Sequence, residues 1–205
     1  MTLQHARIAV SAMFFVNGGL FATWVSRIPG VKQSLGLSER ELGLALLAMA
    51  AGALCAFPVS SFMIARRGSR VVTIVTAFAS CAAVPLAGAS TGFTSLAGAL
   101  ALFGAGMGAM DVAMNANAVE VEKRLDKAIM SASHGFWSLG GFIGGGIGGW
   151  LIERLGAEGH AIFASAVVLV IVLVAMQFLV SEPAHHEDDG PKPAYVWPKA
   201  PIVYI

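Results

Sequence analysis

Long apolar runs alternate with short polar segments along the chain, and this pattern predicts membrane-spanning helices. A helix rises about 1.5 Å per residue, so about 20 apolar residues are enough to cross a bilayer. Six runs reach or approach that length: residues 8–24, 42–64, 71–89, 93–119, 128–152 and 160–180. The chain is therefore expected to be all-α, a polytopic bundle of six transmembrane helices within residues 1–181.

Polar and helix-breaking residues punctuate the first two runs. Asn17, followed by two glycines, interrupts the first run, and Trp24 and Arg27 stand where interfacial anchors are expected. Pro29 is expected to end this helix. The sequence SERE at residues 38–41 has the pattern of a capping box, which opens the next helix.

The composition supports a membrane protein. Hydrophobic residues make up 57% of the chain and charged residues 12%, whereas soluble domains carry about 25% charged residues. The net charge of +1 and the absence of a basic stripe give no indication of a nucleic-acid partner. Cys55 and Cys81 both fall inside apolar runs, so we interpret them as packing residues rather than a disulfide or a metal pair.

Small residues are concentrated in the fourth and fifth runs. Lipid provides no hydrophobic drive for helices to associate, so close packing depends on rows of small side chains. The fifth run has two interleaved rows, Gly140 with Gly144 and Gly148, and Gly141 with Gly145 and Gly149. The fourth run adds Gly104 and Gly108. These rows predict tight helix–helix contacts that can also slide during alternating access.

Asp111, in the fourth run, is the residue that most strongly indicates a functional site. An ionisable group in a spanning helix is costly and by default marks a solute or proton pathway. Asn115 lies one helical turn further on and shares its face. We expect Asp111 to face other protein at lipid depth and to bind a proton or polar solute with Asn115. Asn117 lies on another face, where it can bridge helices or bind a solute.

The fifth run carries further candidates. His134 is either a hydrogen-bonded structural group or a second substrate or proton site beside Asp111, and its spacing does not show whether the two meet. Trp137 either stacks on a sugar ring or packs as an ordinary aromatic residue, and Asn17 is a further possible solute contact. No zinc-protease motif, phosphate loop or redox pair is present, so the chain is not expected to be an enzyme. An intramembrane hydrolase built on Asp111 and His134 has little support.

The distribution of Lys and Arg predicts the orientation, because cytoplasmic loops of membrane proteins are enriched in them. With both termini in the cytoplasm, the inner segments hold nine of these residues: Arg7, Arg66, Arg67, Arg70, Lys123, Arg124, Lys127, Lys192 and Lys199. The outer loops hold four: Arg27, Lys32, Arg40 and Arg154.

Residues 182–205 differ sharply from the rest. The segment 184–193 is polar and contains proline and glycine, as is typical of a solvated linker. Its two histidines and three acidic residues resemble a metal-binding run but are interpreted as a solvated charge cluster, and no metal or cofactor is expected. We expect residues 182–205 to be a cytoplasmic linker and the approach to a seventh helix that stops short.

Several of these features resemble the N-terminal half of a major facilitator superfamily transporter. Arg66, Arg67, Gly68 and Arg70 resemble the gating loop between helices 2 and 3 of that family. The family motif begins with glycine and has an aspartate before the arginine, whereas Ser61 and Ala65 stand there in this chain. The resemblance implies a carrier in a bacterial inner membrane, with a cavity formed between two six-helix halves.

A finer resemblance is to the fucose–proton symporter branch and its bacterial relatives. Residues 110–116, MDVAMNA, are similar to that branch's helix 4, and residues 136–140, FWSLG, to its helix 5. By this resemblance Asp111 is a substrate or proton site of a central cavity. The acid that the branch carries near the end of helix 1 is missing from residues 21–26.

The expected function is therefore transport of a small polar, sugar-like solute, secondary and proton-linked, by a truncated or half transporter. Its partners would be the solute, the lipid bilayer and a C-terminal half or a second copy of the chain. The alternative is a non-transporting membrane protein that acts by helix association through its glycine faces.

Overall fold

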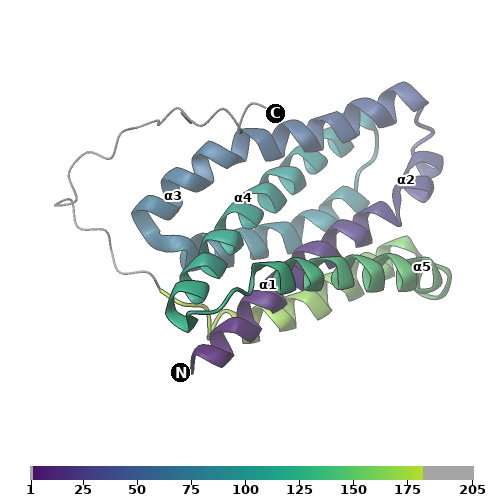
Figure 1. The fold of residues 1–205 in the computed structure, drawn as a ribbon. Coiled ribbons are helices and arrows are strands. Elements are labelled where there is room, and N and C mark those ends of the chain that lie inside the picture. The colour runs from purple at the N-terminus through teal and green to yellow at the C-terminus, as the bar shows by residue number, and fades with distance from the viewer. Residues whose placement is uncertain (1, 182–205) are drawn as a thin grey trace, which may run out of the picture.

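A computed structural model describes residues 2–181, and these residues form a helical bundle (Figure 1). The helices are α1 (Leu3–Val25), α2 (Ile28–Ser34), α3 (Glu39–Gly88), α4 (Phe93–Leu125) and α5 (Met130–Ala175). The all-α prediction is confirmed for this part of the chain. The predicted linker and the approach to a seventh helix, residues 182–205, lie outside the described residues.

Local capping interactions fix several helix ends. Ser38 and Glu41 form the predicted capping box at the start of α3, each side chain bonding the other's backbone N–H. Pro29 lies in the first turn of α2, where the missing N–H of proline is not needed. The first apolar run forms one helix, as expected, and α1 continues without a break through Asn17 and the two glycines after it.

Four helices are long and apolar enough to cross a membrane, not the six separate helices that the sequence predicted. The difference arises in α3 and α5, each of which joins two of the predicted runs across a kink. Each contains one glycine with non-helical backbone angles, Gly68 with φ 79° and Gly156 with φ 72°. These positive φ values favour glycine because it lacks a Cβ.

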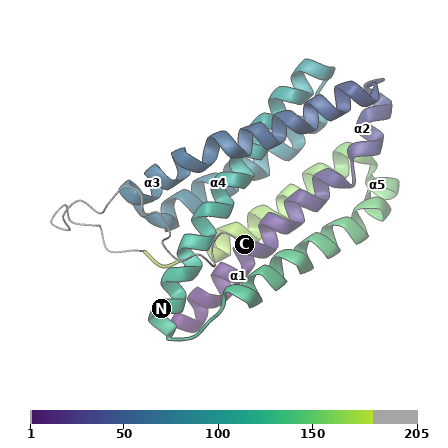
Figure 2. The ribbon, with the colours of Figure 1, turned by 45° about the horizontal axis from the view of Figure 1, so that its top comes forward.

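The chain reverses direction at Gly68. Up to that residue, α3 runs parallel to α4, and beyond it the chain runs antiparallel to α4 (Figure 2). The paired positions are Met49 with Gly104, Ser60 with Ala109, Ser69 with Asn117 and Ser80 with Gly106. A straight helix of 50 residues would measure about 75 Å, more than twice the hydrocarbon core of a bilayer, about 30 Å.

The second reversal is at Gly156. Before it, α5 runs parallel to α1, and Gly140 and Gly148 lie against Phe15 and Ser26 respectively. After it the direction is opposite, since Glu158 lies near the end of α1 while Phe178, just beyond α5, stacks on His5 at its start with ring centroids 5.4 Å apart. Each of α3 and α5 therefore passes through the bundle twice.

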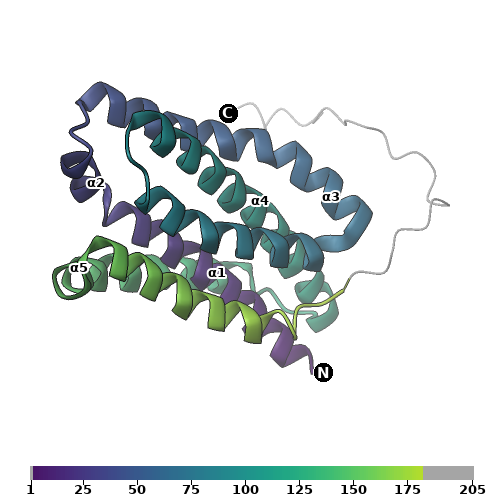
Figure 3. The same ribbon diagram turned by 180° about the vertical axis from the view of Figure 1, so that it is seen from behind.

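The bundle is built from two principal helix pairs, α1 with α5 and α3 with α4 (Figure 3). Glycines lie at both crossings, as the sequence predicted. A Cβ at Gly140 would overlap the carbonyl oxygen of Phe15, and a Cβ at Gly104 would overlap that of Met49. Backbones approach this closely only where no side chain intervenes. Large side chains such as Phe14, Trp24 and Phe103 fill the remaining interior.

Candidate functional site

Asp111 lies about midway along α4, on a side of the helix that the described residues leave exposed. The Asn115 amide donates hydrogen bonds to the Asp111 backbone carbonyl at 2.8 Å and to its carboxylate Oδ1 at 3.3 Å. The predicted sharing of one helix face is therefore confirmed. Asp111 was expected to face other protein, but within residues 2–181 its side chain is exposed.

His134 lies in the second turn of α5 and interacts electrostatically with Asp111. Its Nδ1 is 3.1 Å from the Met130 carbonyl oxygen, and a carbonyl only accepts, so Nδ1 carries the hydrogen. When the ring is neutral, Nε2 is left as an acceptor. The ring packs edge-on against Phe14, with centroids 5.0 Å apart. The fold thus brings together an acid and a histidine that are 23 residues apart in the sequence.

Asn17 and Trp137 form a second polar contact, which joins three helices. The Trp137 indole Nε1 donates to Asn17 Oδ1 at 2.9 Å, and Asn17 Nδ2 donates to the Met107 carbonyl of α4 at 3.4 Å. Asn17 is only 4% exposed, so it has little surface to offer a solute. Trp137 is half-buried and lies beside Phe21, with centroids 6.3 Å apart. Its N–H is occupied, so it can offer a solute the face of its ring.

The predicted gating loop surrounds the reversal at Gly68. Arg66 places its guanidinium 4.3 Å from the centre of the Phe62 ring, and Arg67 is exposed. Arg70 points the other way, donating to the Ser181 hydroxyl at 3.1 Å and to the Met176 carbonyl at 3.2 Å. Arg70 therefore ties the connection between the two passes of α3 to the segment just after α5.

Asn117 has a structural role. It is fully buried and donates to Ser69 Oγ at 2.8 Å and to the Val180 carbonyl at 2.9 Å. It ties α4 to the second pass of α3 and to the segment after α5. Of the two uses that the sequence allowed, the structure has the helix bridge.

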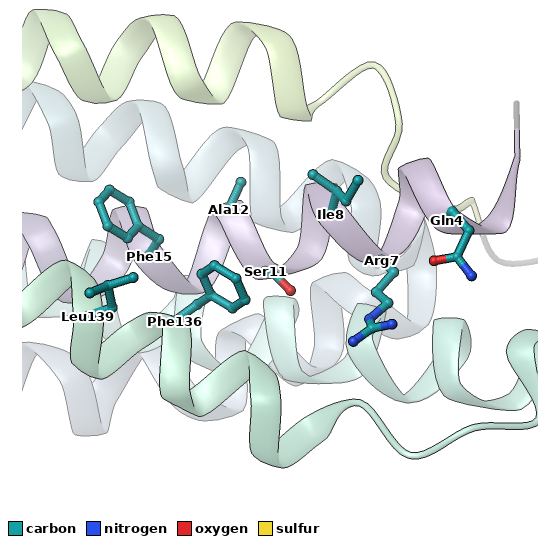
Figure 4. Close-up of a pocket in the computed structure, with 8 residues that line it drawn as sticks. All are labelled: Gln4, Arg7, Ile8, Ser11, Ala12, Phe15, Phe136 and Leu139. Carbon is teal, nitrogen blue, oxygen red and sulfur yellow. The ribbon is translucent and has the colours of Figure 1, made fainter.

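A separate hollow lies between the first turns of α1 and α5, in the region of the N-terminus (Figure 4). Its volume is about 380 Å³, and its lining is mostly apolar, with Arg7 and Gln4 at one end and Phe15 and Phe136 towards the other. Asp111, Asn115 and His134 do not line it. It is therefore distinct from the polar cluster.

The described residues contain no group of three side chains that could hold a metal ion. Both cysteines are free, Cys55 exposed and Cys81 buried. The histidine-rich run after Ser181 lies outside the described residues. One prediction is wrong: Arg27 is not an interfacial anchor but is 2% exposed, inside the bundle. Its position before a proline in a polar segment gave no signal of that burial.

Comparison with known proteins decides the family. Residues 9–203 match the Major Facilitator Superfamily. The chain belongs to this superfamily. It is 34% identical to an uncharacterised MFS-type transporter of Yersinia pestis over 200 residues, which are 97% of this chain and 51% of that protein. It is also 34% identical to the membrane protein MosC of Rhizobium meliloti over 173 residues, 83% of this chain and 41% of that protein.

A solved structure of the same fold is the nucleoside transporter NupG, with a TM-score of 0.71 at 12% identity. The match covers 94% of this chain and 47% of that one. This chain thus spans about half the length of the relatives it matches. Membership of a transporter family indicates a transporter and not an enzyme, as the sequence predicted. The finer resemblance to the fucose–proton symporter branch is not confirmed by these matches.

Proposed function

We propose that the chain is the N-terminal half of a secondary carrier for a small polar solute, with Asp111 as the substrate or proton site. The observations that carry the proposal are the hydrogen bond from Asn115 to Asp111, midway along α4, and the electrostatic interaction of Asp111 with His134 on α5. A charged side chain at that depth is too costly to be kept without a partner or a pathway. The open side of this cluster would then be covered by a second half.

We further propose six membrane passes with both termini in the cytoplasm of a bacterial inner membrane. The reversals at Gly68 and Gly156 support this count, since each divides a helix too long for one crossing. Proton linkage is supported by the electrostatic interaction of a carboxylate with a histidine, since both groups take up and release protons in proteins. The solute is proposed to carry a ring that stacks against the half-buried ring of Trp137.

The test is uptake of radiolabelled sugars and nucleosides into vesicles that contain the chain with a co-expressed C-terminal half. Uptake of at least one solute should require both halves, fall to background in Asp111→Asn, and collapse when a protonophore is added. The matched control is Asp126→Asn, the same chemical change at the end of the same helix, which should transport normally. Uptake that persists in Asp111→Asn would remove the basis of the proposed site.

The second candidate function is helix association without transport. Gly145 and Gly149 lie on an exposed side of α5, with nothing closer than 3.9 Å to a Cβ added at either. Such a surface can receive another helix. A dimer that persists in mild detergent and is lost in Gly145→Leu, together with no uptake under any condition, would favour this function over transport.

A further inference from the structure

Arg27 is a buried charge at the end of the bundle where α2 lies, far from the Asp111 cluster. Its guanidinium is packed against the backbone of Gly88 so closely that a Cβ there would overlap it. Nη1 donates to the Val84 carbonyl at 3.3 Å, while Nε is buried and has no hydrogen-bond partner within the described residues 2–181. Neither of the two ion pairs found among residues 2–181 includes Arg27.

A cavity of about 250 Å³ adjoins this guanidinium. It forms where the ends of α1 and α3 meet the second pass of α5. Pro85, Ala89, Ala161 and Ile162 give it a mostly apolar wall, with Arg27 and Glu158 as the charged members. The chain therefore places one buried cation beside an apolar space.

An unpartnered N–H on a buried guanidinium calls for a ligand. Buried polar groups are nearly always hydrogen-bonded, and burying an unpaired charge is costly. The edge of a guanidinium formed by Nε and Nη2 matches both oxygens of a carboxylate, and such paired bonds are among the strongest in proteins. Arg27 lines the cavity, and its Nε is the guanidinium donor left without a partner among residues 2–181.

The surrounding charges restrict which anion fits. Glu158, which is exposed, and His160, which is 1% exposed, both interact electrostatically with Arg27. The carboxylate of Glu158 repels anions, and more strongly those with two charges than those with one. The apolar wall favours an anion with a hydrocarbon part over a bare inorganic ion.

We propose that this cavity binds a small organic monocarboxylate. Its carboxylate accepts hydrogen bonds from the Arg27 guanidinium, including Nε, and its hydrocarbon part lies against Pro85 and Ile162. The site is independent of the Asp111 cluster and needs only the described chain.

Thermal unfolding of the 205-residue chain in detergent tests the proposal, with butyrate as the probe. A ligand that binds only the folded state raises the unfolding midpoint, and the rise grows with its concentration relative to its Kd. Butyrate should raise the midpoint by a few degrees, whereas butylamine, chloride and phosphate at equal ionic strength should not. No rise with butyrate, or an equal rise with chloride or phosphate, would overturn the monocarboxylate site.

Variants then locate the effect. Arg27→Gln should weaken the butyrate response at least about tenfold in apparent Kd, as expected when a charge-assisted pair is lost. Arg154→Gln is the matched control. Arg154 lies on α5 near the same end of the bundle, but it is exposed and does not line the cavity. It should respond like the unmodified chain.

A cavity-filling variant covers the case in which Arg27→Gln does not fold. Ile162 is 63% exposed, so Ile162→Trp should fold and occupy the space while leaving Arg27 in place. It should abolish the butyrate response. A butyrate response that survives in Ile162→Trp, or in folded Arg27→Gln, would place the binding elsewhere and refute the proposal.

Discussion

The helices α4 and α5 each have a packed side and an open side, and the two sides differ in what their residues do. The packed side, represented by Gly140, Gly148 and Asn117, meets other helices of the bundle. The open side, represented by Gly149, Asp111 and Asn115, is covered less by the rest of the described chain. Small and polar residues occur on both sides, so residue type alone does not separate structural from functional positions.

The two glycine rows of α5 illustrate the difference. In the first row, a Cβ at Gly140 would overlap the Phe15 carbonyl, and one at Gly144 would lie 2.9 Å from the Gly19 carbonyl oxygen. In the second row, Gly145 has only a contact at 3.9 Å, and nothing lies within 4 Å of a Cβ added at Gly149. One row is a tight interface within the chain, and the other is available to something outside it.

The two asparagines of α4 show the same division. Asn117 is buried and bonds two other segments, whereas Asn115 is half-buried and bonds only Asp111 on its own helix. A separation of two residues turns a side chain by about 200° around a helix of 3.6 residues per turn. Asn117, which bridges helices, and Asn115, which bonds the candidate acid, therefore lie on different sides of α4 although they are only two positions apart in the sequence.

The largest expected effect on folding comes from Gly140→Ala compared with Gly149→Ala. The first forces α1 and α5 apart and should lower the free energy of unfolding by roughly 1–3 kcal/mol or more, as overpacked cores do. The second adds a methyl group to open space and should leave stability unchanged or slightly raised, because alanine favours helix over glycine. Thermal unfolding in detergent measures both. Equal losses would show that the two sides do not differ in packing.

An intermediate effect is expected for Asn117→Ala compared with Asn115→Ala. Removing Asn117 leaves its buried partners at Ser69 and Val180 without the amide donor, at a cost of roughly 1–3 kcal/mol in the free energy of unfolding. Asn115→Ala should cost within about 0.5 kcal/mol, because its bonds are exposed. The same unfolding measurement applies. A larger loss for Asn115 would mean that the open side of α4 also stabilises the fold.

The smallest effect is expected for Trp137→Phe, at the boundary between the two sides. It removes one hydrogen bond to Asn17, worth roughly 0.5–1.5 kcal/mol, and keeps an aromatic ring. Trp150→Phe is the control, since Trp150 is 56% exposed and no hydrogen bond to its indole is found within residues 2–181. If the two variants lose the same stability, the Trp137–Asn17 bond does not contribute to joining the three helices.

Several features were predictable from the sequence because they depend on local pattern. The apolar runs predicted the helical class, SERE at residues 38–41 predicted the capping box, and the four-residue spacing predicted that Asn115 shares a helix face with Asp111. The burial of Arg27 and the bond between Asn17 and Trp137 were not predictable, because each depends on contacts between residues far apart in the chain. The sequence predicted separate apolar runs on either side of Gly68 and Gly156, and the chain does reverse there, but each pair of runs belongs to one long helix, so the count of six separate helices is not confirmed.

The sequence by itself determined that this chain is apolar, helical and rich in small residues, and that it carries one carboxylate in the middle of an apolar run. Hydropathy, helical period and capping chemistry act over a few residues, so they can be read without the fold. The tertiary structure decided three things: that Asp111 interacts electrostatically with His134, which of the two glycine rows of α5 is packed against α1, and that Arg27 is buried in the bundle. These outcomes follow from the reversals at Gly68 and Gly156, which set the neighbours of each helix face.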